Sequence, residues 1–552
     1  MPITPAVLPK NADEVVSVKN FMDRVIPLYE QGVGDIELEA DLDTARSAIP
    51  AASGAVRDFS FIAPEIPEFI PENCVGCMDC VTECPDTAIL GKVLSKSEYE
   101  KKMAAMSPEA RAEVEHDWAK TRKYYDANEK QKKEPGMFGI FIDPTKCKGC
   151  AECVQVCDDQ ALKMIKKTDQ NMPAFTRKFD HFRKAGPTPE QYINEKVLAD
   201  MMLRDSSLQY VGGAGSCAGC GEATCLRMFI AATCFVYGPD NLGLIAATGC
   251  NTVYTSTYPY NPYRLPWSNS LFENAPTYAM GVRAKWDQQG WDKKKIWVIG
   301  GDGAMMDIGF QSLSRMLMSG MNIKVIVLDT QVYSNTGGQA STSTYMGQNT
   351  KMSVHGKEIS GKTERRKELA QIIMAHPEVF VAQTTGAHVN HFYKAVMRAN
   401  EYKGPAVVIC YTTCQPEHGV GDHLAGERAR MAVDSRAFPL LVYDPEKGER
   451  MKERLDLRGN PLPDKDWAVD PKTKERIDFI TFARGEGRFE KHFDKNGNPS
   501  EALLLGNADR RRNWRVLQDL AGIEPEKPAG TAGTAAPVAV AKPAVAAVAK
   551  PV

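Results

Sequence analysis

The sequence has no apolar segment that approaches the roughly 20 residues a helix needs to cross a bilayer. It also has no excess of either charge, because 68 Lys and Arg face 70 Asp and Glu, which gives a net charge of -2 and a pI near 6.5. Such a balance implies neither nucleic acid nor an anionic membrane as a partner. The opening MPITPAVLPKNADEVV lacks a basic n-region and a continuous apolar core. This argues against secretion, and we expect a reducing cytoplasm.

Cysteine, by contrast, is abundant: the chain has 15, and most of them are grouped. Without a signal peptide, grouped C-x-x-C spacing indicates metal or cluster binding rather than disulfides. Two runs have the spacing C-x-x-C-x-x-C-x-x-x-C, which binds cubane 4Fe-4S clusters in bacterial ferredoxins. The small residues Gly76 and Gly149 let each short loop present three thiolates. The runs are Cys74, Cys77, Cys80, Cys84 and Cys147, Cys150, Cys153, Cys157.

The fourth cysteine of each run is expected to serve the cluster of the other run, as in two-cluster ferredoxins. Pro85 follows the first run as the motif requires, whereas Asp158 takes that position after the second. A zinc site is the alternative, but zinc usually needs four ligands rather than a doubled set of four. One cluster would thus take Cys74, Cys77, Cys80 and Cys157, and the other Cys147, Cys150, Cys153 and Cys84.

The length of 552 residues predicts several domains. Between the two runs, residues 95–135 are rich in charged residues and Ala, with Ser107 and Pro108 placed as N-cap and first helical residue. We expect this insertion to be a solvated helical excursion. The final residues, 526–552, have no aromatic side chain and are expected to be disordered. The other expected parts are a docking arm or linker over 1–70 with a helix around 15–29, a small α+β two-cluster ferredoxin-like domain over 71–165, a linker over 166–205, an α/β domain over 206–440, and a charged extension over 441–525 that ends in a helix near 510–520.

Short apolar runs separated by helical stretches characterise the chain from about residue 206. They are LGLIAATG, KIWVIGGDG, IKVIVLDT, VFVAQTTG and AVVICYTT. Runs of this kind predict buried parallel strands, and hence an open, mostly parallel sheet with flanking helices. Such a sheet binds ligands at the carboxyl ends of its strands, where the polar motifs of this sequence lie.

Two of these strand ends are suited to a diphosphate. Gly301, Asp302 and Gly303 follow one strand, and DTQVYSNTGGQ begins at the end of the next. A glycine turn lets backbone N–H groups approach a phosphate, and Asp302 can give Mg²⁺ an oxygen ligand. Alone, G-D-G is equally consistent with a tight turn after a strand.

Together, GSCAGCGE, ATGCNTVY, PWSNSLFENA, GDGAMMDIG and DTQVYSNTGGQ resemble the cofactor domain of the pyruvate:ferredoxin oxidoreductase family, and residues 71–165 resemble the ferredoxin-like domain that precedes it. The resemblance covers about Pro71 to Pro445 and implies bound thiamine diphosphate. It assigns Mg²⁺ to Asp302, to the Thr330 side chain and to the Val332 carbonyl. The cofactor-binding residues that it implies are Gly301, Asp302, Gly303, Thr330, Val332, Asn335 and Cys250.

The resemblance also implies two residues close to the reacting centre, Asn335 and Glu222. The alternative for Glu222 is an acid favoured by the dipole at a helix N-terminus. His418 and His423 lie in a Gly-rich loop, where we expect them to be solvated and to take no part in acid–base chemistry.

A third 4Fe-4S cluster, close to the thiamine, is implied as well. Its ligands would be Cys217, Cys220, Cys250 and Cys414. From the residues alone, Cys217 and Cys220 make a fair ligand pair, whereas isolated Cys250 and Cys414 would more often be buried small hydrophobes. The remaining cysteines, Cys225, Cys234 and Cys410, are expected in the core.

In the resembled family, the glutamate that contacts the aminopyrimidine lies in an N-terminal pyrimidine-binding domain, for which residues 1–73 leave no room. We therefore expect a β-type subunit, completed by an α-type partner in an (αβ)2 hetero-oligomer. The expected reaction is oxidation of pyruvate with CoA to acetyl-CoA and CO2, or its reverse, with electrons leaving through the three clusters to ferredoxin or flavodoxin. The alternatives are 2-oxoglutarate or another 2-oxo acid as substrate, and an electron-transfer subunit with a vestigial thiamine site.

Overall fold

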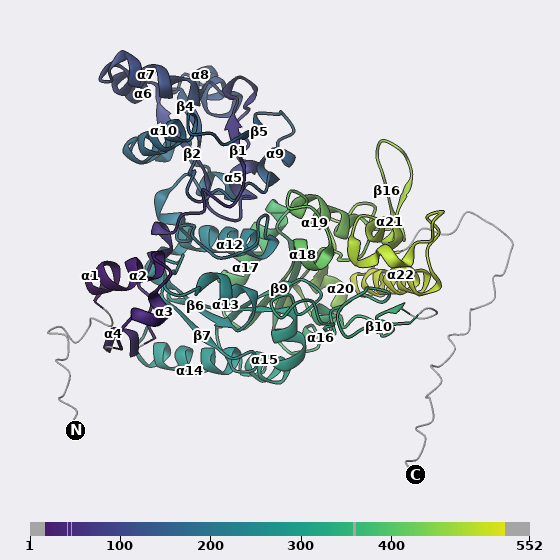
Figure 1. Ribbon diagram of the computed structural model, residues 1–552. Helices are drawn as coiled ribbons and strands as arrows, with labels where there is room; N and C mark the ends of the chain where they lie inside the picture. The colour runs from purple at the N-terminus through teal and green to yellow at the C-terminus, as the bar shows by residue number, and fades with distance from the viewer. Residues whose placement is uncertain (1–16, 41, 46, 357–359, 525–552) are drawn as a thin grey trace, which may run out of the picture.

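A computed structural model describes residues 17–40, 42–45, 47–356 and 360–524 (Figure 1). Its main sheet has eight strands in the order β15-β14-β12-β13-β9-β8-β6-β7. The six neighbouring strands β12, β13, β9, β8, β6 and β7 run parallel to one another. Strand β14 pairs antiparallel with β12 and with β15. This confirms the predicted open, mostly parallel sheet. The strands are β6 (Leu242–Ala247), β7 (Trp267–Ser270), β8 (Lys295–Gly301), β9 (Lys324–Asp329), β12 (Phe380–Thr385), β13 (Ala406–Tyr411), β14 (Leu441–Tyr443) and β15 (Leu455–Asp456).

All five apolar runs form strands because the sheet is buried on both faces. Ile326 and Leu328 of β9 point to one core, and Val325 and Val327 point to the other. Two helices, α12 (Gly221–Tyr237) and α17 (Val389–Glu401), cover the first face. The second face is covered by α14 (Ala275–Gln288), α15 (Phe310–Leu317) and α16 (Leu369–Ile373).

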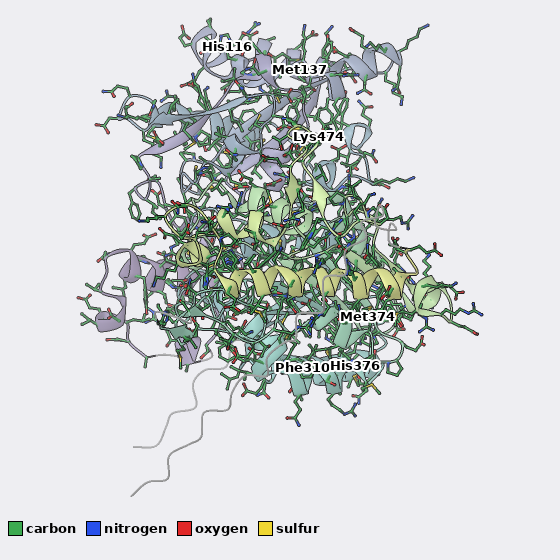
Figure 2. All side chains as sticks on the ribbon, turned by 90° about the vertical axis from the view of Figure 1, so that its right-hand side faces the viewer. His116, Met137, Phe310, Met374, His376 and Lys474 are labelled. Atoms are coloured by element: carbon green, nitrogen blue, oxygen red, sulfur yellow. The ribbon has the colours of Figure 1, made fainter. Side chains whose placement is uncertain are left out.

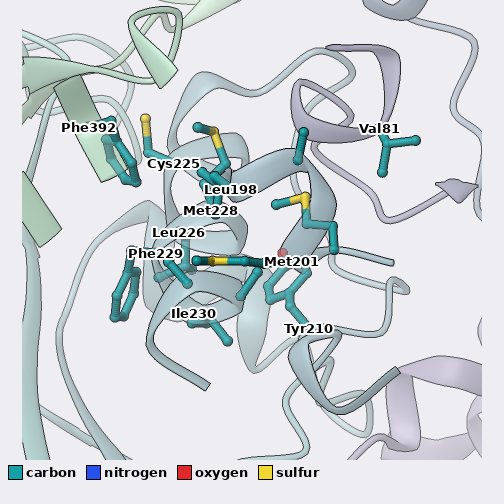
Figure 3. Packing of buried hydrophobic residues seen from close by; sticks show 14 of the residues in the cluster. Val81, Leu198, Met201, Tyr210, Cys225, Leu226, Met228, Phe229, Ile230 and Phe392 are labelled. Atoms are coloured by element: carbon teal, nitrogen blue, oxygen red, sulfur yellow. The ribbon is translucent and has the colours of Figure 1, made fainter. Parts of the chain in front are cut away.

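Helix α12 lies between the main sheet and the cysteine-rich N-terminal part. Its residues from Gly221 to Phe235 are all buried, with no polar face. Figure 3 shows Leu226 and Phe229 of α12 in the core cluster that also contains Val81, from the first cysteine run, and Phe392 of α17. Since this helix starts directly after Cys220, it anchors that cysteine between the two parts of the chain.

The two cysteine runs fold as a structural repeat. Gly76 and Gly149 have φ of 81° and 68°, and Met78 and Ala151 follow with φ of 69° and 64°. Each run then forms one helical turn, α5 (Asp79–Thr82) or α9 (Glu152–Gln155). The surrounding strands are β1 (Glu65–Phe69) paired with β5 (Leu162–Lys166), and an antiparallel sheet of β2 (Ile89–Ser95), β4 (Gly136–Ile142) and β3 (Trp118–Ala119).

The insertion between the runs differs in part from the prediction. It contains the expected helices α6 (Lys96–Ala104) and α7 (Pro108–Val114), and the Ser107 hydroxyl caps α7 by accepting a hydrogen bond from the Ala110 N–H at 3.3 Å. However, Trp118 and Tyr124 are buried, and β3 pairs with β4. The expectation of a solvated excursion is wrong for this second half, because its aromatic side chains complete the small core.

Residues 166–205, which we expected to be a linker, also pack on this part. The helix α10 (Met172–Lys184) buries Phe179 and Phe182 against Trp118 and Phe141. The short helix α11 (Leu198–Met201) is buried against α12. The segment therefore covers the small sheet as well as connecting it to the large one.

The two ends of the described chain dock on the sheet domain. The helical turns α1 (Val18–Asn20), η1 (Phe21–Val25) and α2 (Ile26–Glu30) follow one another, and Phe21, Val25 and Ile26 pack against Tyr258 and Tyr260. The expected helix near 510–520 is longer, since α22 spans Glu501–Ala521 and crosses the face shown in Figure 2. Trp514 of α22 shares a core with Val325 and Tyr411. The tail over 526–552 and residues 1–16 lie outside the described residues.

Two further features complete the description. Strands β14 and β15 lie within the expected C-terminal extension but belong to the main sheet, and the helix α21 (Phe479–Arg484) packs on α22. Lys474, labelled in Figure 2, lies in the turn between β16 (Ala468–Val469) and β17 (Arg476–Ile477). Within the residues that the structure describes, no helix is both long enough and apolar enough to span a membrane.

Candidate functional site

Four predicted site residues stand at the carboxyl ends of neighbouring parallel strands. Cys250 begins α13 (Cys250–Thr255) after β6, and Asp302 follows β8. Thr330 follows β9, and Cys414 precedes α18 (Gln415–His418) after β13. Because these strands lie side by side in the sheet, residues distant in sequence meet along one edge.

A compact set of oxygen atoms surrounds Asp302. Its Oδ1 lies 3.2 Å from the Thr330 hydroxyl oxygen, which in turn lies 3.1 Å from the Val332 carbonyl oxygen. A carboxylate, a hydroxyl and a backbone carbonyl are hard oxygen ligands of the kind that Mg²⁺ prefers. The structure therefore brings together the three residues predicted to hold Mg²⁺.

The electrostatics of Asp302 also fit a cation. Asp302 is buried, and burial together with the nearby Asp329 raises the pKa of its carboxyl. Asp329 is itself compensated, because Arg366 pairs with it at 2.5 Å in a fully buried position. Asp302 has no such cationic partner among the described residues, and a divalent ion would offset the cost of its buried charge.

The cleft next to these oxygens is lined by Gly301, Asp302, Gly303 and Val332 among others. A Cβ at Gly303 would lie 2.3 Å from the Tyr333 ring, so only glycine leaves this turn in place. Asn335 is exposed and lines the same cleft. The arrangement can accept a diphosphate on the backbone N–H groups of the turn.

Glu222, in the first turn of α12, faces this cleft as well. Its side chain is buried, and Oε2 has no hydrogen-bond partner within the described structure. Burial, and then Asp302, raise the pKa of Glu222 to about 8. A helix-dipole role alone does not account for an unpartnered buried oxygen, and a ligand in the cleft would provide a partner.

The four cysteines of the predicted innermost cluster line one cavity. It adjoins the cleft through the shared lining residues Glu222, Cys250, Thr330, Ser334 and Asn335. Gly219 has φ of 69°, and a Cβ there would lie 1.9 Å from the Asp422 carbonyl oxygen, so glycine is required between the first two ligands. The cysteines are Cys217, Cys220, Cys250 and Cys414.

The two cysteine runs contribute to shared sets of side chains. A pocket is lined by Cys74, Cys77, Cys80 and Cys157, so the last cysteine of the second run lies with the first run. In the other set, burial raises the pKa of the Cys147 and Cys150 thiols, and the nearby Cys84 raises both pKa values further. Cys84 thus lies with the second run. Each thiol would need a cation to ionise in such surroundings, which suits cluster iron.

Single-ion sites are a different matter. Among the residues described, no group of three or more His, Cys, Asp or Glu side chains is placed to hold one metal ion.

The predicted solvation of the two loop histidines is wrong for His418 and right for His423, which is exposed. His418 is fully buried, and burial lowers its pKa. Its Nδ1 accepts from the Cys414 N–H at 3.4 Å, so the neutral ring donates from Nε2 to the Thr330 carbonyl at 2.8 Å. His418 therefore connects a predicted cluster ligand to a predicted Mg²⁺ ligand.

The C-terminal extension, from which we expected little chemistry, supports the same region. Arg488 donates to the Gln331 side chain at 3.0 Å and pairs with Glu486 at 2.6 Å. Cys225, Cys234 and Cys410 are buried as expected, with 3.0 Å between the sulfurs of Cys225 and Cys410.

Comparisons with known proteins agree with this geometry. Residues 247–410 match the family model "Thiamine pyrophosphate enzyme, C-terminal TPP binding domain". A probable pyruvate-flavodoxin oxidoreductase of Escherichia coli is 30% identical over 464 residues, covering 70% of this chain and 36% of that protein. The pyruvate:ferredoxin oxidoreductase of Moorella thermoacetica is 26% identical over 465 residues, covering 70% of this chain and 37% of that protein. The chain thus spans little more than a third of these relatives.

Among solved structures, a 2-oxoglutarate:ferredoxin oxidoreductase from Magnetococcus marinus is similar at 20% identity with a TM-score of 0.32. This similarity covers 37% of the present chain and 65% of that one, and is too low to establish a common fold.

Proposed function

We propose that this chain, which belongs to the pyruvate:ferredoxin oxidoreductase family, is the part of a 2-oxoacid oxidoreductase that binds thiamine diphosphate and three 4Fe-4S clusters. The proposal rests on one observation: two cavities lie directly next to each other. One contains the oxygens of Asp302 and Thr330, the other contains four cysteines, and Glu222 and Cys250 line both. A site for two-electron carbon chemistry would therefore border directly on a one-electron carrier.

Asp302, Thr330 and the Val332 carbonyl would hold Mg²⁺, and the backbone of residues 301–303 would receive the diphosphate. Thiamine diphosphate, when bound, supplies an electron sink for decarboxylation of a 2-oxo acid. Glu222, with a pKa near 8, would keep a proton at neutral pH and could donate it in a hydrogen bond to a group in the cleft. Asn335 would contact the reacting centre from the rim.

The proposed reaction is pyruvate plus CoA giving acetyl-CoA, CO2, one proton and two electrons, or the reverse. Cubane clusters carry single electrons at low potential, which suits ferredoxin or flavodoxin as acceptor rather than a hydride carrier. Electrons would pass from the cleft to the set containing Cys250 and then to the two interleaved sets. The names of the two relatives support pyruvate as the substrate.

A partner is proposed for the remainder of the site. The relatives carry the matched region within longer chains, of which this chain covers 36% and 37%. We propose that an α-type subunit, in the cytoplasm, supplies the pyrimidine-binding domain and the residues that bind the substrate carboxylate, in an (αβ)2 assembly.

The experiment is to purify the chain anaerobically from its native source, with any stably bound subunit, and to measure thiamine diphosphate, iron and sulfide. Dye reduction with CoA is then assayed with pyruvate, 2-oxoglutarate and oxalate, for the complex and for the chain alone. Pyruvate-dependent reduction by the complex only is expected. Clusters without thiamine diphosphate would instead establish an electron-transfer subunit, and full activity of the chain alone would remove the need for a partner.

A further inference from the structure

Arg227 is a buried arginine that points from α12 towards the cysteine-rich part. It is 2% exposed, on a helix whose residues from Gly221 to Phe235 are all buried. Its Nη1 donates to the backbone carbonyl oxygens of Val81, Thr82 and Cys84, the last at 3.1 Å. These carbonyls belong to the segment between Cys80 and Cys84, which are predicted ligands of different clusters.

The rest of the guanidinium has no partner. Within the described residues, Nε and Nη2 of Arg227 are buried and make no hydrogen bond. A buried cation with unpaired donors is destabilising unless a negative charge lies nearby. The structure therefore needs an anion next to Arg227.

The neighbouring carboxylate of Asp86 does not meet this need. Asp86 is close enough to raise the pKa of Arg227, but it already accepts a hydrogen bond from Lys148 at 2.6 Å. The side chains of Asp86 and Lys148 are each 3% exposed. Lys148 lies between Cys147 and Cys150. Lys148 and Arg227, two buried cations, thus share the single buried carboxylate of Asp86.

The sulfurs beside Arg227 indicate where the negative charge would come from. Burial lowers the pKa of Arg227, while Cys84, then Asp86, Tyr210 and Cys80 raise it. Cys84 lies with the second cysteine run and Cys80 with the first. A 4Fe-4S cluster with four thiolates carries a net negative charge, and reduction adds an electron to it. A fixed positive charge beside it stabilises the reduced form most.

We propose that Arg227 is the charge-compensating residue of the paired clusters, and that it raises the reduction potential of both, chiefly of the cluster held by Cys84, Cys147, Cys150 and Cys153. This inference rests on the proposed cluster binding. Arg227 touches no substrate. It acts on the clusters through its charge and through the carbonyls of the turn that carries their ligands, which favours delivery of electrons from the innermost cluster to the Cys84 cluster.

The test is an EPR-monitored redox titration of the anaerobically purified, cluster-loaded protein in four forms: wild type, Arg227→Met, Arg227→Lys and Lys324→Met. Lys324 is a matched control, because it is also fully buried beneath the same face of the sheet and donates to backbone carbonyls, but it lies away from the cysteines. We expect Arg227→Met to shift the Cys84 cluster to a more negative potential and the Cys80 cluster by a smaller amount. Arg227→Lys should retain most of the wild-type potential, and Lys324→Met all of it.

Unchanged potentials in a fully loaded Arg227→Met protein would overturn the inference, as would an equal shift in Lys324→Met. If Arg227→Met loses iron, the reduction potentials of Arg227→Gln and Arg227→Lys are compared instead. A more negative potential in Arg227→Gln alone supports the inference, and equal potentials in the two variants overturn it. A wild-type protein without clusters would overturn the proposed function together with this role, whereas loaded wild type with unshifted variants overturns the role of Arg227 alone.

Discussion

The hydroxyl oxygen of Thr330 lies 3.2 Å from Oδ1 of Asp302, although 28 residues separate the two in sequence. Adjacent parallel strands, β8 and β9, produce this contact by ending at the same edge. We predict that Asp302→Ala weakens Mg²⁺-dependent thiamine diphosphate binding by at least about 100-fold, since it removes the only charged ligand, and that Thr330→Val weakens it by about 10-fold. Anaerobic calorimetry measures both, and cluster absorbance should be unchanged.

The control for the threonine is Thr176→Val, on the exposed side of α10. It should bind the cofactor as wild type does. Wild-type affinity in Asp302→Ala would show that the metal is held elsewhere.

Cys414 lines the same cavity as Cys217, Cys220 and Cys250, but comes from a distant part of the chain. We predict that Cys414→Ala loses the innermost cluster alone, which is about one third of the iron expected for three 4Fe-4S clusters. Cys410→Ala, four residues earlier on β13 and in contact with Cys225, should keep all of its iron. Iron and sulfide analysis with EPR of the reduced protein distinguishes the two. Equal iron loss in both variants would indicate a general loss of folding.

The interleaving of the two runs predicts which substitutions share a phenotype. Cys157→Ala should give the same EPR spectrum as Cys77→Ala, because both residues line the pocket that also contains Cys74 and Cys80. The EPR spectrum of Cys84→Ala should instead match that of Cys150→Ala, since Cys84 and Cys147 are both close enough to raise the pKa of the Cys150 thiol. A match between Cys157→Ala and Cys150→Ala would mean that each run holds its own cluster.

The sequence was sufficient for the sheet and for most of the site because both depend on local patterns. Continuous apolar runs predict buried strands, and the residue after each strand falls at a known edge, so Asp302 and Thr330 could be placed together in advance. The cysteine spacing similarly predicted the interleaved sets. For Cys250 and Cys414, however, the residues alone gave no signal, and a family resemblance was needed.

What the sequence did not reveal depends on contacts between distant segments. His418 was expected in solvent because its neighbours are glycines, but the loop folds under Thr330 and buries the ring. Trp118 was expected in a solvated excursion, yet it packs against α10. The apolar residues on α10, and on α22 for the main core, were visible in the sequence, but nothing local indicated which surface they would cover.

Two half-buried histidines at the start of α17 predict how stability depends on pH. His388 and His391 each bond to a threonine hydroxyl at 2.9 Å, near the positive N-terminal end of the helix. Burial chiefly lowers the pKa of each to about 4. Between pH 6.5 and 4 the unfolded chain therefore binds more protons at these histidines than the folded chain does. Their contribution to the free energy of unfolding is fully present above about pH 6.5 and is lost as the pH falls towards 4.

The loss should be at most on the order of 3 kcal/mol for each histidine, from a shift of roughly 2.5 pKa units. We predict that the fall in melting temperature between pH 7 and pH 5 is smaller in His388→Asn and in His391→Gln than in the wild type. His423→Asn, at an exposed position, should follow the wild-type curve. Because acid also affects bound clusters, the informative quantity is the difference between each variant and the wild type at equal iron content. Parallel curves for all four proteins would mean that other groups set the acid limit.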